Sequence, residues 1–285
     1  MMILIGMLVV ISCVIGAYVA HGGHIFVLWQ PAEFIIIVGA AIGAFIIGNT
    51  KYVLSHLGSS LKMALKGKAF DKADYLELLT LQFALFKLIK TKGMLELETH
   101  IETPKESKIF SNYPHFMEHH EAITFFCDYL RMLTMGSENV HQMEELMTQE
   151  IDIHHHERGL ISTALQNMAD SMPALGIVAA VLGVIHTMGS INQPPEVLGK
   201  LIGAALVGTF LGILLSYGFI GPLSNIVKSL YESEAQYFNC MKAGILACMN
   251  GYAPAIAVEY ARKSIESEYR PDFYELEKAI ATDSV

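Results

Sequence analysis

The chain has 285 residues, 53% hydrophobic and only 16% charged, and its mean hydropathy of +0.41 excludes an ordinary soluble domain. Its net charge of −9 and the lack of a basic patch argue against nucleic acid as a partner. The cysteines Cys13, Cys127, Cys240 and Cys248 form no CxxC pair, so we expect neither a zinc site of that kind nor a dense disulfide framework.

Charged side chains are distributed unevenly along the chain. Among the first 50 residues only Glu33 is charged, and residues 168–227 contain only Asp170, Glu196 and Lys200. This alternation predicts an all-α, polytopic membrane protein with four transmembrane helices and a helical cytoplasmic domain. The predicted parts are transmembrane helices 1 and 2 in residues 1–50, a cytoplasmic helical domain in 51–167, transmembrane helices 3 and 4 in 168–227, and a cytoplasmic helical tail in 228–285.

The first two predicted spans lie close together at the start of the chain. Ile3–Ala20 is an apolar run near the minimum length that crosses roughly 30 Å of hydrocarbon. No Lys or Arg precedes it, which favours a retained anchor over a cleaved signal peptide. Ala32–Gly48 follows Pro31, which occupies a position where a helix can begin without losing a hydrogen bond.

The predicted cytoplasmic domain contains three segments with apolar residues at helical spacing. They are Tyr75–Lys92, Glu121–Met135 and Val140–His156. This spacing predicts amphipathic helices. Few segments resemble strands, so the domain should be almost wholly helical.

Adjacent histidines in this domain raise the alternative of a metalloenzyme. They are His119 with His120, and His154 to His156. Neighbouring side chains on a helix point about 100° apart, so a triplet does not supply three convergent ligands. HExxH-like spacing, nucleophile motifs and phosphate-binding loops are lacking. We therefore expect no metal, no cofactor and no enzymatic activity.

The second pair of predicted spans is Met168–Met188 and Val197–Ile220. Small residues recur at four-residue spacing in the spans, at Gly39 and Gly43 and again at Ala204, Gly208 and Gly212. Such stripes let helix backbones approach closely in lipid. They are equally compatible with packing of the chain's own spans and with packing against another subunit.

Basic residues indicate the orientation of the spans. The loop His21–Gln30 contains no Lys or Arg, whereas Lys51 and Lys62 follow span two and Lys228 follows span four. The positive-inside rule therefore places the long middle segment and both termini in the cytoplasm.

Within the spans we expect no carboxylate near mid-membrane. Glu33 and Asp170 occur at the starts of predicted spans, where each can interact with its helix N-terminus. These features favour a chain that walls an ion path whose titrating group comes from a partner. Pro173 and Pro222, near the cytoplasmic ends of spans three and four, predict either a flexing gate or static kinks.

Several long motifs occur in order: "GAYVAHGG" with "QPAE", "IETPKESKIFSNYP", "DSMPALGIVAAVLGVIHTMGS", "LIGAALVGTFLGILLSYGFIGPL" and "NGYAPAIAVEYARK". Through these motifs nearly the whole chain resembles the MotA family, the multi-span stator subunits of bacterial flagellar motors. The resemblance implies a homopentamer around two MotB-type single-span subunits, whose membrane aspartate carries the ion. It also implies torque on the rotor switch protein FliG.

The resemblance also implies roles for individual residues. Pro173 and Pro222 match the family's functional prolines, thought to couple ion passage to motion. Thr209 and Ala180 match pore-facing positions of spans four and three. Because sodium needs several converging oxygens and these spans have few hydroxyls, H⁺ is the favoured ion.

In the cytoplasmic domain, Glu98 matches the acidic residue that engages the rotor. The family's basic companion is an arginine, and here that position is Lys90, which keeps the charge but loses the planar fork. Lys87 and Lys92 are nearby and could share the role.

Two other membrane functions compete with this interpretation. ExbB and TolQ proteins are related energisers of outer-membrane processes, but they usually have three spans, and the Glu98 region also argues against them. A stand-alone ion channel or transporter would instead conduct ions without a partner.

Overall fold

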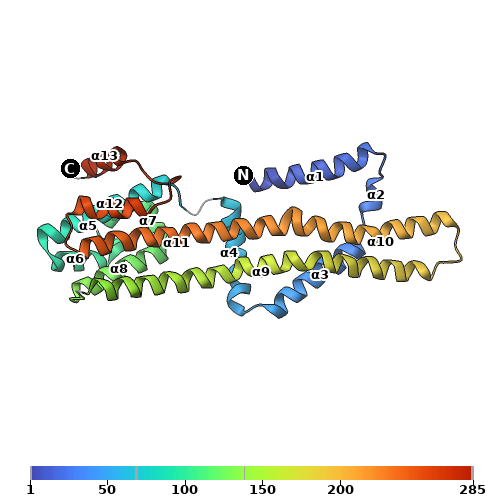
Figure 1. The fold of residues 1–285 in the computed structure, drawn as a ribbon, viewed down its shortest axis with the longest axis horizontal. Coiled ribbons are helices and arrows are strands. Elements are labelled where there is room, and N and C mark those ends of the chain that lie inside the picture. The colour runs from blue at the N-terminus through green and yellow to red at the C-terminus, as the bar shows by residue number, and fades with distance from the viewer. Residues whose placement is uncertain (1, 68–69, 138, 284–285) are drawn as a thin grey trace. The chain divides into compact units, whose positions relative to one another are not determined.

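The computed structural model describes residues 2–67, 70–137 and 139–283, which form helices and loops with no strand among them (Figure 1). The chain divides into two compact units. Residues 1–68 and 157–230 form the first, called here the membrane unit. Residues 69–156 and 231–285 form the second, called here the helical unit.

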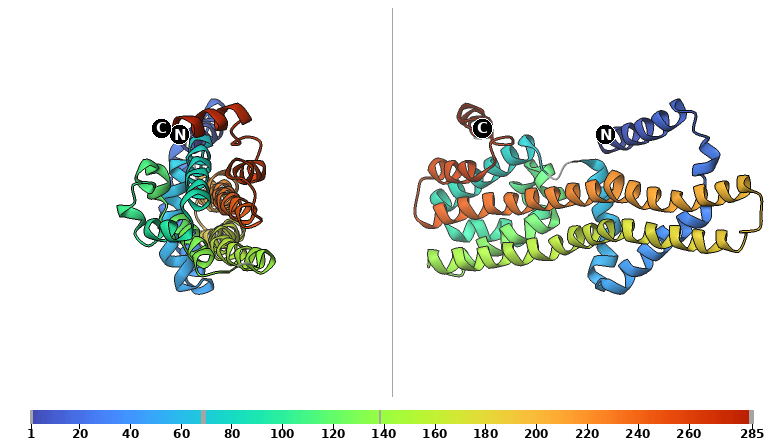
Figure 2. Two further views of the ribbon diagram at one scale, coloured as in Figure 1. Left: turned by 90° about the vertical axis from the view of Figure 1, so that its left-hand side faces the viewer. Right: turned by 45° about the vertical axis from the view of Figure 1, so that its right-hand side comes forward.

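The helices of the membrane unit confirm the predicted number of spans. They are α1 (Met2–Ala20), α2 (Ile25–Leu28), α3 (Pro31–Gly48), α4 (Lys51–Lys66), part of α9 (Val140–Met188), α10 (Pro195–Leu215), the π-helical turn η3 (Ser216–Ile220) and the start of α11 (Gly221–Met249). Among the described residues, four helical stretches are long and apolar enough to cross a membrane: Met2–Ala20, Ile25–Gly48, Val140–Met188 and Pro195–Met249. Within this unit α10 runs antiparallel to the second half of α9 (Figure 2).

Helix α9 is longer than the sequence pattern predicted. It is one continuous helix of 49 residues, so the predicted amphipathic helix Val140–His156 and the predicted third span are parts of a single element. Asp170 therefore lies in the middle of a helix, and the expectation that it interacts with a helix N-terminus is wrong. Its carboxylate instead accepts a hydrogen bond of 2.8 Å from the Gln166 amide.

The helices of the helical unit cover the predicted amphipathic segments. They are α5 (Lys72–Lys92), α6 (Met94–Ile101), η1 (Pro104–Glu106), η2 (Phe110–Asn112), α7 (Pro114–Glu118), α8 (His120–Thr134), parts of α9 and α11, α12 (Pro254–Ser264) and α13 (Phe273–Asp283). Helix α5 contacts α6, α7, α12 and α13, so it lies at the centre of this unit. It begins with a capping box in which the Asp71 and Asp74 side chains each accept a hydrogen bond from the other's backbone N–H.

Aromatic side chains build the core of the helical unit. The rings of Phe70 and Tyr237 stack with centroids 3.8 Å apart, and Phe126 packs edge-on against Phe116 at 5.9 Å. These side chains are fully or almost fully buried. Burial of their large apolar area stabilises this unit.

Candidate functional site

Helices α9 and α10 of the membrane unit approach each other closely at glycine positions. A Cβ added at Gly212 would lie 2.6 Å from the carbonyl oxygen of Met172, and one added at Gly176 would lie 2.7 Å from the carbonyl oxygen of Gly208. Distances this short leave no room for a side chain. The two backbones therefore touch because glycines face each other.

This contact decides how part of the small-residue stripe is used. Gly208 and Gly212 pack against the chain's own α9. The stripe on α3 differs, because a Cβ built at Gly39 or Gly43 would meet no described atom within 4 Å. Own-chain packing thus explains the α10 stripe and leaves the α3 glycines without a close neighbour in the described part of the chain.

Two residues predicted to line an ion path border the same contact. A Cβ on Gly208 would lie 3.1 Å from the backbone nitrogen of Ala180, and a Cβ on Gly176 would lie 3.3 Å from the Cα of Thr209. Both residues are half-buried within this chain. The fold therefore brings Ala180 and Thr209, which are far apart in sequence, to one level of the α9–α10 pair.

The two prolines have different local structures. Pro173 is inside α9, which continues through it. Pro222 follows the π-helical turn Ser216–Ile220, in which the N–H of Gly221 donates to the carbonyl of Ser216, five residues earlier. Because proline has no N–H to donate, this wider turn is the kind of local adjustment that accommodates it. The Ser216 hydroxyl is fully buried and has no hydrogen-bond partner among the described residues.

Glu33 is a membrane-unit residue whose surroundings the sequence did not predict. It is only 8% exposed, and its Oε2 has no hydrogen-bond partner within the described residues. A Cβ on Gly208 would lie 2.9 Å from Oε2, and a Cβ on Gly183 would lie 3.2 Å from Oε1. The carboxyl therefore occupies a space that exists because α9 and α10 carry glycine there.

Glu33 lies in the first turn of α3, as expected for a carboxyl near a helix N-terminus, but it does not cap that helix. Helix α3 has Gln30 as its N-cap residue and no side-chain capping hydrogen bond. The Glu33 carboxyl instead reaches Gly208, the central residue of the uncharged run 201–215 of α10. A charged carboxylate at such a position costs about 2.5–3.5 kcal/mol on membrane-insertion scales.

The signal for Glu33 was present in the sequence. It is the only charged residue among the first 50, and an ionisable residue within a span is a functional candidate by default. The sequence did not show how far the Glu33 side chain extends from its own helix. Glu33 lies in the first turn of α3, yet its side chain extends to the contact between two other helices.

The residues predicted to bind a rotor are on the helical unit. Lys90 lies in the last turn of α5 and Glu98 lies on α6, and both are exposed. No ion pair joins them to each other among the described residues. Of the neighbouring lysines, Lys92 pairs with Glu96 at 3.8 Å, and the Lys87 ammonium lies 5.9 Å from the Phe83 ring centre.

One histidine of the helical unit has the neighbours that a metal ion would require. Ligand atoms of Glu121 on α8, His154 on α9 and Glu234 on α11 all lie within 4.8 Å of one another. Nitrogen and carboxylate oxygen ligands suit zinc. However, a 3.0 Å hydrogen bond between His154 Nε2 and Glu121 Oε2 accounts for the approach of these two side chains without a metal. His155 and His156 are exposed, as expected for adjacent positions of one helix.

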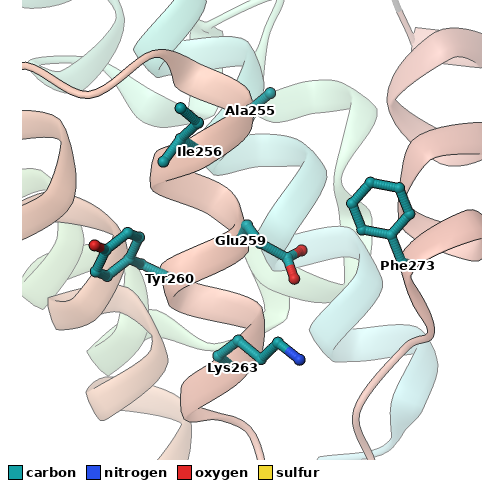
Figure 3. Close-up of a pocket in the computed structure, with 6 residues that line it drawn as sticks. All are labelled: Ala255, Ile256, Glu259, Tyr260, Lys263 and Phe273. Atoms are coloured by element: carbon teal, nitrogen blue, oxygen red, sulfur yellow. The ribbon is translucent and has the colours of Figure 1, made fainter.

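A surface pocket of about 450 Å³ lies on the helical unit, formed by α12 with Phe273 (Figure 3). The Glu259 and Lys263 side chains point toward the side of Phe273, whereas Tyr260 points the other way. Arg262 donates a 2.8 Å hydrogen bond to Glu259 and holds the pKa of that carboxyl below its ordinary value. This pocket belongs to the helical unit, so it is not part of the α9–α10 contact.

The fold and these contacts define a polytopic helical membrane protein with a glycine-packed pair of spans. Two family models match it: motility protein A N-terminal over residues 4–93, and the MotA/TolQ/ExbB proton channel family over residues 118–240. "Motility protein A" of Salmonella typhimurium is 44% identical over 280 residues, 98% of this chain and 95% of that protein. The chain belongs to the motility protein A family.

Other relatives agree with this assignment. "Chemotaxis protein LafT" of Vibrio parahaemolyticus is 38% identical, over 97% of both chains. Two solved structures share the fold at lower identity. A chain of C. jejuni MotAB has a TM-score of 0.78 at 16% identity, over 95% of this chain and 98% of that one. A chain of the flagellar MotAB stator complex from Bacillus subtilis has a TM-score of 0.71 at 23% identity, over 90% and 92%.

Proposed function

We propose that the chain is a stator subunit of a bacterial flagellar motor. With a MotB-type single-span partner it forms a proton channel in the inner membrane and converts ion flow into torque on the rotor protein FliG. The observation that carries this proposal is 44% identity to a motility protein A over nearly the full length of both chains. The α9–α10 contact supports it, since Ala180 and Thr209 border one level of that contact.

The proposed assembly is a pentamer of this chain around two copies of the partner. The titrating aspartate belongs to the partner, and Ala180 and Thr209 face it. The α3 glycines Gly39 and Gly43 are available for close packing between subunits, because no described atom occupies the space beside them. In this proposal the helical unit and both termini are cytoplasmic, which the basic residues after spans two and four support.

Torque in this proposal comes from stepwise neutralisation of the partner's aspartate. An entering ion weakens the attraction of the aspartate to polar groups of the ring and lets the ring advance. Each elementary charge that crosses 100 mV releases about 2.3 kcal/mol, several times the thermal energy. Pro173 and Pro222 transmit the change along α9 and α11, and Lys90 and Glu98 push the rotor through charge contacts.

The family match weakens the rival interpretations. An ExbB- or TolQ-like energiser shares the proton channel family of residues 118–240, but the motility protein A N-terminal family matches residues 4–93 as well. A stand-alone channel predicts ion flux from vesicles that contain this chain without a partner. Such flux would contradict the proposal that the partner supplies the titrating aspartate and this chain supplies the wall of the ion path.

The decisive test is motility of a bacterium whose own stator genes are replaced by this chain and its partner. We expect Pro173→Ala to reduce torque by about tenfold or more, because it removes a point of altered helix hydrogen bonding on the coupling path. The matched control is Pro195→Ala, at the first turn of α10, which should leave torque within about twofold of the unaltered chain. Unchanged torque in Pro173→Ala, or no motility from the unaltered pair, contradicts the proposal.

The rotor contact is tested separately by reversing charge. Glu98→Lys should reduce torque while the complex still assembles and conducts, because Glu98 is exposed on α6 and holds no part of the fold together. Glu106→Lys is the matched control, since Glu106 is also exposed and close in sequence. Equal torque in the two variants would remove Glu98 from the rotor surface.

A further inference from the structure

The buried Glu33 carboxyl has no role in the proposed motor mechanism. In that proposal the aspartate of the partner carries the ion, and this chain supplies only the wall. Yet the membrane unit itself contains a carboxyl that is 8% exposed, with one oxygen unpartnered among the described residues. A buried polar group without a partner is costly, so its retention calls for a role.

On the basis of the proposed function, we propose that Glu33 is a proton-binding group of this chain that exchanges its proton with the ion path beside Ala180 and Thr209. The exchange is a simple protonation: a carboxylate oxygen gains a proton from the outer side of the membrane and later releases it to the path. No other bond changes.

The space beside Gly183 and Gly208 that holds the Glu33 carboxyl, called here the seat, borders the predicted ion path. A Cβ on Gly208 would meet Glu33 Oε2 at 2.9 Å and the backbone nitrogen of Ala180 at 3.1 Å. Thr209 follows Gly208 directly in the chain. Glu33 Oε2 thus lies where Gly208, which has no side chain and precedes Thr209, faces the backbone of Ala180.

The seat favours a neutral carboxyl over a permanently charged one. Glycine faces both carboxyl oxygens, and alanine lies beside it: a Cβ on Gly183 would lie 3.2 Å from Glu33 Oε1 and 2.7 Å from the Cβ of Ala205. No positively charged side chain contacts Glu33 among the described residues. Without a counter-charge, a carboxyl in apolar surroundings is stabilised by protonation.

The titratable residues on the helices around the seat do not pair with Glu33. His186 of α9 and Glu196 and Lys200 of α10 are all exposed. They form no ion pair with Glu33 in the described part of the chain. The charge state of Glu33 is therefore set by its apolar seat and by access of protons.

The ligand chemistry of the seat suits a proton better than a sodium ion. Sodium requires several oxygens that converge on one point. The seat offers the two oxygens of Glu33, and the positions that face them, Gly183 and Gly208, have no side-chain oxygen to add. The Thr187 hydroxyl, one turn beyond Gly183, donates to the Gly183 carbonyl at 2.9 Å and is thus already engaged.

A purely structural alternative is that Glu33 only stabilises the N-terminus of α3. A carboxylate in the first turn does favour a helix N-terminus. That role is best served by a solvated side chain at the helix end, and it needs no gap in α9 and α10. Glycine at these two positions serves both requirements, because a Cβ at Gly183 or Gly208 would meet Glu33 as well as a residue of the facing helix.

The test uses the complex of the full chain with its single-span partner in lipid vesicles. The key variant is Glu33→Gln, which keeps the shape of the side chain and cannot titrate. The matched control is Glu196→Gln, the same chemical change at an exposed position of the same unit. Copurification of the partner confirms that each variant assembles. Proton uptake under a pH gradient is measured with a dye trapped inside the vesicles, in sodium-free and in sodium-containing buffer.

We expect Glu33→Gln to slow proton flux by about tenfold and Glu196→Gln to leave it within about twofold. A second measurement does not depend on conduction: infrared difference spectra recorded across a pH change. The unaltered complex should show the carbonyl stretch of a protonated carboxylic acid, and Glu33→Gln should lose that part of the signal, whereas Glu196→Gln should retain it.

Failure of this inference differs from failure of the proposed function. If the unaltered complex conducts protons while Glu33→Gln has the same flux and the same infrared signal, Glu33 is not a proton-binding group. If the difference in flux between the unaltered complex and Glu33→Gln appears only in sodium-containing buffer, the proton is not the ligand of Glu33. If the unaltered complex does not conduct at all, the motor proposal fails, and the infrared signal still decides whether Glu33 binds a proton.

Discussion

The membrane unit and the helical unit of this chain are packed in opposite ways. In the membrane unit α9 and α10 meet glycine on glycine, between Gly176 and the Gly208–Gly212 turn. In the helical unit the core is a cluster of stacked and edge-on aromatic rings, with Phe126 and Tyr237 fully buried. One chain thus packs its helices in two ways, through glycine contacts in one unit and through aromatic side chains in the other.

The difference follows from the two solvents. In water, burial of apolar area stabilises a fold, so large aromatic side chains belong inside. In lipid, burial of apolar side chains gains little, because the acyl chains are equally apolar. Close backbone approach and dispersion contacts then matter most, and large apolar side chains remain on the outside. Ile35, Ile47 and Leu206 are exposed in this way in the membrane unit.

The largest expected effect comes from removing an aromatic ring from the helical unit. Phe126→Ala should destabilise that unit by about 3–5 kcal/mol, because the ring is fully buried and leaves a cavity. Hydrogen exchange should accelerate in α5 and α8 and remain slow in α10. Phe273→Ala is the control, since its ring is 53% exposed. Equal acceleration in α10 would show that the two units unfold together.

A smaller effect is expected from adding one methyl group between the spans. Gly212→Ala should cost about 1–3 kcal/mol, since the new Cβ would lie 2.6 Å from the Met172 carbonyl oxygen and must push the helices apart. Thermal unfolding of the full chain in detergent measures this loss. The control Gly203→Ala adds the same methyl group on α10 where no described atom lies within 4 Å, and should be neutral or slightly stabilising. Similar losses in both variants would contradict the close glycine contact.

The smallest expected effect concerns an ion pair of the helical unit. Glu259→Gln should cost about 1 kcal/mol at neutral pH, because Arg262 donates to the Glu259 carboxylate and is itself largely buried. Since Arg262 lowers the pKa of Glu259, this contribution is complete above the ordinary carboxyl pKa and is lost as the pH falls through the lowered value.

Denaturant unfolding across acid pH measures this dependence, and the difference between the unaltered chain and Glu259→Gln should shrink as the pH falls. Glu277→Gln, at an exposed position of α13, is the matched control. A difference that stays constant with pH would show that the pair does not act through the charge of Glu259.

Local pattern was sufficient for most of the helices. Apolar spacing predicted Tyr75–Lys92 and the structure has α5 at Lys72–Lys92, and Glu121–Met135 corresponds to α8 at His120–Thr134. The four apolar stretches were equally evident, because a span needs about 20 consecutive apolar residues. The roles assigned to Pro173, Thr209, Lys90 and Glu98 came from family resemblance and stay predictions.

By itself, then, the sequence determined the helical class, the four spans and the family, since each depends on composition, periodicity or motifs that neighbouring residues carry together. Only the tertiary structure decided that α9 is one helix, that the α10 glycines meet α9, that Glu33 lies in the space they leave, and that His154 meets Glu121. These features depend on which helices pack side by side, and a side chain's surroundings come from residues far away in the chain. Glu33 is the clearest case, because its meaning changed from a helix-end charge to a buried carboxyl once Gly183 and Gly208 were placed beside it.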